Sequence, residues 1–128
     1  MSDVRVVIVD DQEIYRSALT GLLEIAGGYR VVAEAGSGEE ALELVAANAP
    51  DLVFLDLRLP GIDGTAVTAA IRSADRVPLV VLISTDVEAL RSDAVQRSGA
   101  FGTRAKADLD LPWLETLRSQ VRRARPRR

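Results

Sequence analysis

Val4-Arg5-Val6-Val7-Ile8-Val9-Asp10-Asp11 is an apolar run that ends directly in two carboxylates. A second run, Leu52-Val53-Phe54-Leu55, ends in Asp56. If both runs are parallel strands, their carboxyl ends meet at one edge of a sheet, where open α/β sheets bind ligands. The three carboxylates then form an acidic cluster at that edge, which suggests a divalent metal and phosphate chemistry.

Apolar runs alternate with helical patterns along the rest of the chain, which is typical of repeated strand-helix units. We predict strands at Val4–Val9, 30–35, Leu52–Asp56, 79–83 and, more weakly marked, 102–104. The first, third and fourth are continuous apolar runs, as strands buried on both faces require. The pattern predicts a doubly wound α/β fold, in which right-handed crossovers place helices on both faces of a parallel sheet.

The segments between these strands have apolar side chains at helical spacing. The fourth helix should cover residues 88–97, and the fifth should begin near Pro112 and stop before Pro126. Helix ends are expected at Gly27-Gly28, Ala49-Pro50 and Gly99. The predicted apolar faces are Ile14, Ala18 and Leu22 in the first helix, Ala41 and Val45 in the second, Val67 and Ile71 in the third, and Leu114, Leu117 and Val121 in the fifth.

The composition excludes several classes of protein. With 128 residues, 48% of them hydrophobic, the chain is long and apolar enough for one domain with a real core. The absence of cysteine excludes disulfides and thiolate metal sites, and the absence of histidine excludes Ser-His-Asp catalysis, histidine-ligated zinc and a phosphohistidine on this chain. Because no leader or membrane-length apolar run is found, we expect a cytoplasmic protein without a membrane partner.

The net charge of −3 is unevenly distributed along the chain. Five arginines fall in the last seven residues: Arg122, Arg123, Arg125, Arg127 and Arg128. The remainder has 11 basic against 19 acidic residues, which argues against direct nucleic-acid binding by the globular part. We assign residues 1–121 to the domain and residues 122–128 to a basic tail. We interpret the tail as the start of a linker or as a solvated helix end, and we rank both above a weak nucleic-acid-binding arm.

The acidic cluster favours a metal over a purely structural role. One aspartate of Asp10-Asp11 would be enough to cap the following helix. Two adjacent carboxylates raise each other's proton affinity, so the second one calls for a cation. Mg²⁺ prefers a few carboxylates together with waters and phosphate oxygens. Asp56 beside them becomes a candidate nucleophile, because a carboxylate can accept a phosphoryl group as an aspartyl phosphate.

Phosphoryl transfer also needs cationic and hydrogen-bonding groups around the phosphoryl oxygens. Ser84 is the first polar residue after the fourth strand, and Lys106 follows the fifth. Thr85 is an alternative to Ser84, because a fully buried strand has no alternation that fixes its register. Taken singly, the two residues are better explained as a strand-terminating hydroxyl and an ordinary exposed lysine.

Several motifs, in order along the chain, together resemble the response regulator receiver domain. They are Val6-Val7-Ile8-Val9-Asp10-Asp11, the stretch from Pro50-Asp51-Leu52 through Asp56 to Gly64, and Gly99-Ala100-Phe101-Gly102 followed by Lys106. The resemblance covers essentially the whole chain. It implies a flavodoxin-like three-layer sandwich of five helices and a five-stranded parallel sheet in the order 2-1-3-4-5.

By this resemblance, Asp56 is the phosphoacceptor, and the donor is a phosphohistidine on a sensor histidine kinase. The protein would not be an enzyme but a signalling phosphoacceptor that assists its own phosphorylation and dephosphorylation. The other implied site residues are Asp10, Asp11 and the backbone carbonyl of Arg58 as Mg²⁺ ligands beside Asp56, Ser84 as the switch hydroxyl, and Lys106 as the partner of the phosphoryl group.

The chain departs from the family pattern near its fifth strand. Thr103 occupies the switch position where most members have an aromatic residue, and Arg104 follows where an apolar residue is usual. Ala107 follows Lys106, so a cis Lys-Pro bond cannot form there. A non-proline cis bond would cost about 3 kcal/mol, and we therefore expect another path for this loop.

Arg58 and Asp86 are proposed to set the lifetime of the phosphorylated state. They lie two residues after Asp56 and Ser84, respectively, and we expect them to approach each other over the site and hinder an attacking water. The alternative is that they are two solvated loop charges, since exposed ion pairs contribute little.

Other readings of the same residues remain open. Aspartate-nucleophile phosphatases have an Asp-x-Asp motif, whereas here Arg58 lies two residues after Asp56. A P-loop is also excluded, because the chain contains no Gly-Lys-Ser or Gly-Lys-Thr. A flavodoxin-like cofactor binder would need a phosphate-cradling loop after the first strand. The stronger alternatives are a receiver that acts without phosphorylation, or the regulatory half of a truncated DNA-binding transcriptional regulator. A homodimer through the fourth and fifth helix region would be compatible with either.

Overall fold

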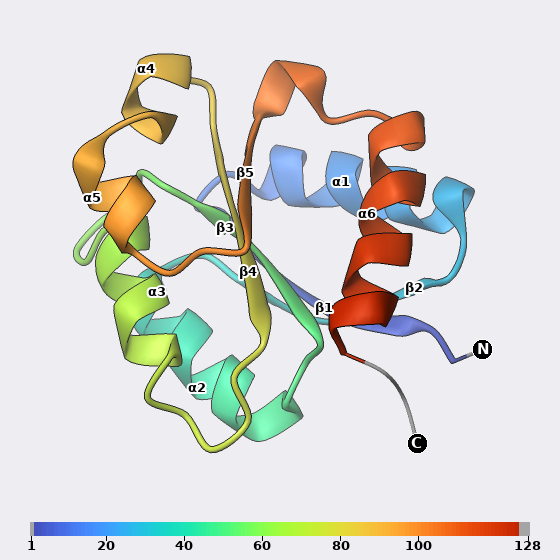
Figure 1. Cartoon of the computed structure of the whole chain (residues 1–128), viewed down its shortest axis with the longest axis horizontal. Helices are drawn as coiled ribbons and strands as arrows, with labels where there is room; N and C mark the ends of the chain where they lie inside the picture. The colour runs from blue at the N-terminus through green and yellow to red at the C-terminus, as the bar shows by residue number, and fades with distance from the viewer. Residues whose placement is uncertain (1, 126–128) are drawn as a thin grey trace.

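The computed structural model describes residues 2–125. Five parallel strands form one sheet in the order β2-β1-β3-β4-β5, with helices on both faces (Figure 1). The predicted strand order is therefore confirmed. In chain order the elements are β1 (Val4–Val9), α1 (Glu13–Ala26), β2 (Tyr29–Ala35), α2 (Gly38–Asn48), β3 (Leu52–Asp56), α3 (Gly64–Ile71), β4 (Leu79–Ser84), α4 (Val87–Leu90), α5 (Asp93–Arg97), β5 (Gly102–Ala105), a 3-10 helix (Lys106–Asp108) and α6 (Leu111–Ala124).

The apolar strands form the centre of the sheet because both of their faces are buried. β3 is buried over its whole length, and its neighbours β1 and β4 are buried at nearly every position. Alternate side chains along each strand enter two separate cores. α2, α3, α4 and α5 cover one core, and α1 and α6 cover the other (Figure 1).

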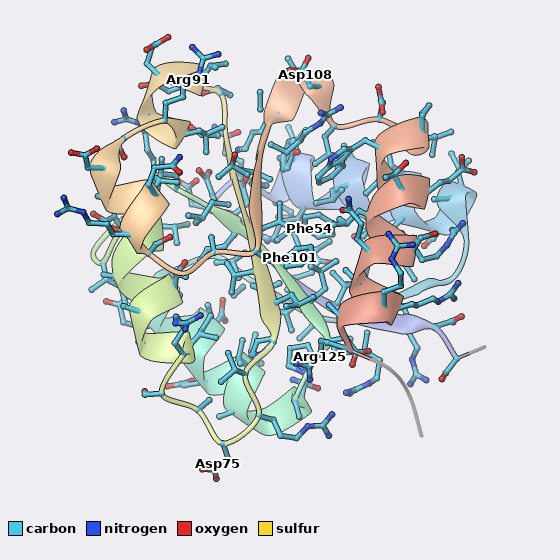
Figure 2. The ribbon with its side chains drawn as sticks, in the orientation of Figure 1. Phe54, Asp75, Arg91, Phe101, Asp108 and Arg125 are labelled. Carbon is cyan, nitrogen blue, oxygen red and sulfur yellow. The ribbon has the colours of Figure 1, made fainter. Side chains whose placement is uncertain are left out.

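Phe54 is the largest fully buried side chain, and it lies in the core under α6. Its ring centroid is 6.3 Å from that of Trp113 on α6, at an interplanar angle of 56°. Figure 2 shows Phe54 inside the molecule, while Asp75, Arg91 and Asp108 point away at its periphery. Burial of a side chain of this size contributes about 1.5–3 kcal/mol to folding, so β3 is fixed between the two cores.

The helix ends follow the predicted residues. α1 ends at Gly27, whose φ of 75° favours glycine, and α2 ends at Ala49 in the left-handed region, one residue before Pro50. α6 has proline in its first turn and ends before Pro126, as predicted. The predicted apolar faces of the second, third and fifth helices are buried.

The predicted apolar face of the first helix was wrong. Ile14 is 86% exposed and Ala18 is exposed, whereas Leu19 and Leu23, one residue later in the pattern, are buried. α1 has apolar residues in two adjacent i, i+4 series, so their spacing alone does not show which series faces the sheet. Packing on the sheet buries Leu19 and Leu23 and leaves Ile14 and Ala18 in solvent, while Leu22 of the predicted face is partly buried against the same core.

The predicted fourth helix is divided into α4 and α5. The Ser92 side chain accepts a hydrogen bond from the Val95 backbone N–H, and its extended backbone interrupts the helix. A serine that caps a new helix competes with continuation of the old one. Both pieces remain anchored to the core, through Leu90 and Val95.

The first residues of the predicted basic tail continue the helix α6. Arg122 and Arg123 lie in the last turn of α6, where positive charge is favourable. Arg125 donates a hydrogen bond to the Val77 carbonyl. Arg127 and Arg128 lie outside the described residues, and the division at residue 122 stays a prediction. None of the helices within residues 2–125 is long and apolar enough to cross a membrane.

Asp63 provides a test of how the β3–α3 connection is held. Its carboxylate accepts hydrogen bonds from the Thr65 hydroxyl, at 2.7 Å, and from the Ala66 N–H, at 3.0 Å, and these bonds lower its pKa. We expect Asp63→Ala to lower the free energy of unfolding by about 1 kcal/mol at pH 7, measured by urea denaturation.

Asp63→Asn is the matched control, because asparagine is also a good cap. A carboxyl whose pKa is lowered by folding stabilises the protein above its unfolded pKa and loses that contribution as the pH falls through the folded value. Any advantage of wild type over Asp63→Asn should therefore shrink below about pH 4. Equal stability of wild type and Asp63→Ala at pH 7 would contradict this role of the cap.

Candidate functional site

Three carboxylates meet at the carboxyl edge of the sheet, as predicted. Asp10 follows β1, Asp56 is the last residue of β3, and these strands are direct neighbours. One carboxylate oxygen from each of Asp10, Asp11 and Asp56 lies within 4.8 Å of the others. Asp10 and Asp56 are buried and Asp11 is exposed, so the cluster is open to solvent on one side.

Backbone groups orient the two buried carboxylates. The Gln12 N–H donates to Asp10 Oδ1 at 2.8 Å, and the Arg58 N–H donates to Asp56 Oδ1 at 3.0 Å. Gly64 permits the tight loop after β3, since a Cβ there would lie 2.8 Å from the Asp56 carbonyl oxygen. The second oxygen of each buried carboxylate is left to face the centre of the site.

Lys106 occupies that centre. Its Nζ is 2.6 Å from Asp10 Oδ2 and 3.1 Å from Asp56 Oδ2. Burial lowers the pKa of Lys106, but the hydrogen bonds and charges of Asp10 and Asp56 outweigh it and leave the pKa above its usual value. Lys106 is therefore a charged ammonium group that neutralises the cluster.

The negative charge of Asp56 is poorly stabilised by its surroundings. Burial raises its pKa, and the charge of Asp10 adds to that effect. The hydrogen bonds from the Arg58 N–H and from Lys106 oppose the increase without cancelling it. A carboxylate with poor solvation beside an ammonium group is suited to nucleophilic attack on an electrophile that brings its own negative charge.

The loop after β5 takes a path without a cis peptide bond, as predicted. No cis bond occurs within residues 2–125, and Lys106–Asp108 form a 3-10 helix that leads into α6. The buried Leu109 follows and packs under α6. Lys106 thus reaches the acidic cluster from the end of the edge strand β5.

Ser84 ends β4 and its side chain is buried, whereas the alternative, Thr85, is exposed. The Ser84 hydroxyl accepts a hydrogen bond from the Asp86 N–H at 3.0 Å. This places a hydroxyl at the same sheet edge as Asp56, since β3 and β4 are paired.

Arg58 and Asp86 form an ion pair of 2.7 Å between the loops that follow β3 and β4. A hydrogen bond from the Ala89 N–H lowers the pKa of Asp86, and Arg58 contributes to the same shift. The two side chains approach each other, as we expected, but the Arg58 side chain is 68% exposed and that of Asp86 is 41% exposed. Their effect on an attacking water stays a prediction.

Thr103 is exposed on β5, while Arg104 packs toward α6. The Arg104 guanidinium lies 5.0 Å from the centroid of the Trp113 ring, and its Nε donates to the Asp108 carbonyl at 2.8 Å. These two contacts accommodate Arg104 at a position where an apolar side chain is usual in the family. The switch role of Thr103 stays a prediction.

Sequence reasoning missed two residues of the site. Arg16 donates to the Asp10 carbonyl at 2.6 Å and pairs with Glu34 at 3.0 Å, which ties α1 to β2 beside the cluster. The Tyr15 ring centroid lies 4.3 Å from Lys106 Nζ. Burial raises the pKa of Tyr15 to about 12, with contributions from Asp10 and Asp56, so the phenol is neutral. Their position in the first turn of the first helix was the available signal.

The donor set fits Mg²⁺. All three acidic side chains offer oxygen ligands, which hard divalent cations prefer, and the exposed Asp11 leaves room for waters. Neither histidine nor cysteine is present, so a softer metal would have no preferred ligand in this chain.

Comparisons with known proteins agree with this geometry. Residues 6–108 match the family described as the response regulator receiver domain. The "Probable transcriptional regulatory protein NarL" of Mycobacterium tuberculosis is 43% identical over 98 residues, which are 76% of this chain and 45% of that protein. The response regulator UvrY of Escherichia coli is 31% identical over 116 residues, which are 91% of this chain and 53% of that protein.

The solved structure of the signal receiver domain of NarL from Mycobacterium tuberculosis has a TM-score of 0.85 and 35% identity, covering 99% of this chain and 100% of that domain. The chain spans about half the length of the curated relatives that it matches. The motifs, the strand order and the acidic site agree with the family match, and the chain belongs to the response regulator receiver domain family.

Proposed function

We propose that Asp56 accepts a phosphoryl group from a phosphohistidine on a sensor histidine kinase. The observation that carries this proposal is the position of the buried Asp56 carboxylate, at the end of β3, between the acidic pair Asp10 and Asp11 and the ammonium group of Lys106. Residues 1–128 contain no histidine, so the phosphohistidine lies outside this domain.

The transfer is a displacement at phosphorus. An Asp56 oxygen forms the new P–O bond, and the P–N bond to the donor imidazole breaks with its electron pair remaining on nitrogen. Lys106, already 3.1 Å from Asp56 Oδ2, pairs with the oxygens of the phosphoryl group. When bound by Asp10, Asp11, Asp56 and the Arg58 carbonyl, Mg²⁺ supplies positive charge against the phosphoryl oxygens.

Ser84 is proposed to donate its hydroxyl hydrogen to the phosphoryl group and thereby signal phosphorylation. Its oxygen accepts from the Asp86 N–H, and this bond uses an oxygen lone pair and not the hydroxyl hydrogen. Thr103 lies on the adjacent strand and is proposed as the second switch position, although its short side chain has no ring to rotate.

The domain is proposed to act as the regulatory part of a longer transcriptional regulator in the cytoplasm. The support is that NarL, a transcriptional regulatory protein by its name, is about twice as long as the matched region. Residues 122–128 would then begin a linker, and the region of α4, α5 and α6 would form a homodimer.

The role of Asp56 as phosphoacceptor can be tested directly. Incubation of wild type with acetyl phosphate and Mg²⁺ should add the mass of one phosphoryl group, and Asp56→Asn should abolish the addition because the amide is not a nucleophile. The adduct should be stable in acid and labile in base. Chelation of Mg²⁺, or Asp11→Asn, should slow the addition by about tenfold or more.

Asp63→Asn is a matched control, since it changes another aspartate on the β3–α3 loop outside the cluster. It should be phosphorylated like wild type. Absence of any mass increase in wild type, or an unchanged increase in Asp56→Asn, would contradict the proposed function.

The effect of the Arg58–Asp86 ion pair on dephosphorylation can be tested separately. If the pair hinders water, Arg58→Ala should speed the loss of phosphate from the phosphorylated protein by about two- to fivefold, as expected for an exposed pair. Asp86→Asn, which keeps a capping side chain on α4, should have a similar effect.

Arg91→Ala is the control, because Arg91 forms an exposed ion pair with Glu88 on α4 at 3.4 Å. Its dephosphorylation rate should equal that of wild type. An unchanged rate in Arg58→Ala, measured by mass spectrometry over time, would show that Arg58 and Asp86 are only solvated loop charges.

A further inference from the structure

Lys106 is the only lysine in the chain, and three groups surround its ammonium. Two are the carboxylates of Asp10 and Asp56, and the third is the ring of Tyr15, whose centroid is 4.3 Å from Nζ. We propose that Tyr15 is a positioning residue that holds Lys106 over the acidic cluster through the face of its ring. This inference rests on the proposed role of Lys106 in phosphoryl transfer.

Lys106 reaches the cluster through a long, flexible side chain that is only 10% exposed, so the contacts around it must hold it in place. Its side chain has four rotatable bonds, and a lysine loses considerable conformational freedom when it is fixed. It projects from the end of the edge strand β5, whose residues are at most partly buried. The following Ala107 is exposed and packs into neither core.

The carboxylate partners are also the groups that the proposed reaction changes. Asp56 becomes an acyl phosphate, and Asp10 is a proposed metal ligand. The attraction of an ammonium group to an aromatic face does not depend on the charge of either carboxylate. The Tyr15 contact is therefore a restraint on Lys106 that stays the same before and after transfer.

Tyr15 is well placed for this role. It lies in the first turn of α1, directly after the Asp10-Asp11 loop, so the same segment supplies the acidic pair and the ring. The ring is partly buried in the core under α6, which fixes its orientation and shields the contact from water. Shielding strengthens the attraction between a cation and an aromatic face.

The position of Lys106 can be tested without any phosphodonor. Because the chain has one lysine, ¹³C,¹⁵N-lysine labelling gives a single set of side-chain NMR signals. In wild type and Tyr15→Phe, the protons of the Lys106 side chain next to Nζ should be shifted upfield by the ring. In Tyr15→Leu and Tyr15→Met, which fill the space without a ring, that shift should be lost.

The effect on the reaction is tested by a double-mutant cycle. With acetyl phosphate and Mg²⁺, Tyr15→Leu should slow the phosphorylation of Asp56 by roughly 3- to 30-fold, the range expected for a cation–ring contact. Tyr15→Phe should retain most of the rate. In a Lys106→Met background, Tyr15→Leu should have no further effect, because a positioning residue acts only through the group that it positions.

Ile14→Ala is the matched control, since Ile14 is the preceding residue on α1 and is 86% exposed. Its lysine signals and its rate should equal those of wild type. An unshifted lysine signal in wild type, a Tyr15→Phe rate as low as that of Tyr15→Leu, or an equal loss in the Lys106→Met background would overturn the proposal. Failure of wild type to be phosphorylated would contradict the proposed function instead, while the NMR measurement would still decide the role of Tyr15.

Discussion

The contact of Lys106 with Asp10 and Asp56 is the interaction on which the site depends. The two carboxylates are 0% and 6% exposed, and unpaired charges at that depth would cost several kcal/mol each. One ammonium group between them reduces this cost, and it must come from a chain segment that ends at the same edge of the sheet. Parallel strands satisfy this requirement, because β1, β3 and β5 all point their carboxyl ends to one side. The fold and the chemistry therefore impose the same geometry.

The fold was largely predictable because its three central strands, β1, β3 and β4, are almost continuous apolar runs. Five runs separated by helical segments permit few arrangements, and the family resemblance identified the order. The errors occurred where two local patterns compete. The two apolar series of α1, which include Ile14 and Leu19, have the same spacing, and only packing on the sheet distinguishes them. At Ser92 a capping hydroxyl competes with an otherwise acceptable helix, and the strength of that competition depends on the burial of Leu90 and Val95 on either side.

The acidic cluster was predictable for a different reason: residues at strand ends are placed by the backbone alone. Asp10, Asp11 and Asp56 needed only the register of two neighbouring strands. The contact of Tyr15 with Lys106 joins residues far apart in sequence and depends on the direction of two long side chains. No periodicity encodes such a contact. The same holds for Arg104, whose guanidinium lies over the ring of Trp113 on α6.

The hydrogen bond from Arg125 to the Val77 carbonyl fixes where the chain leaves the domain. Val77 lies two residues before β4, and Ser84 is the last residue of β4. Arg125 and the acidic cluster therefore lie at opposite ends of the strands. The six residues of β4 separate these two ends by about 20 Å. A change at Asp56 therefore has the length of the packed strand β4 to cross before it reaches the residue at which the described part of the chain ends.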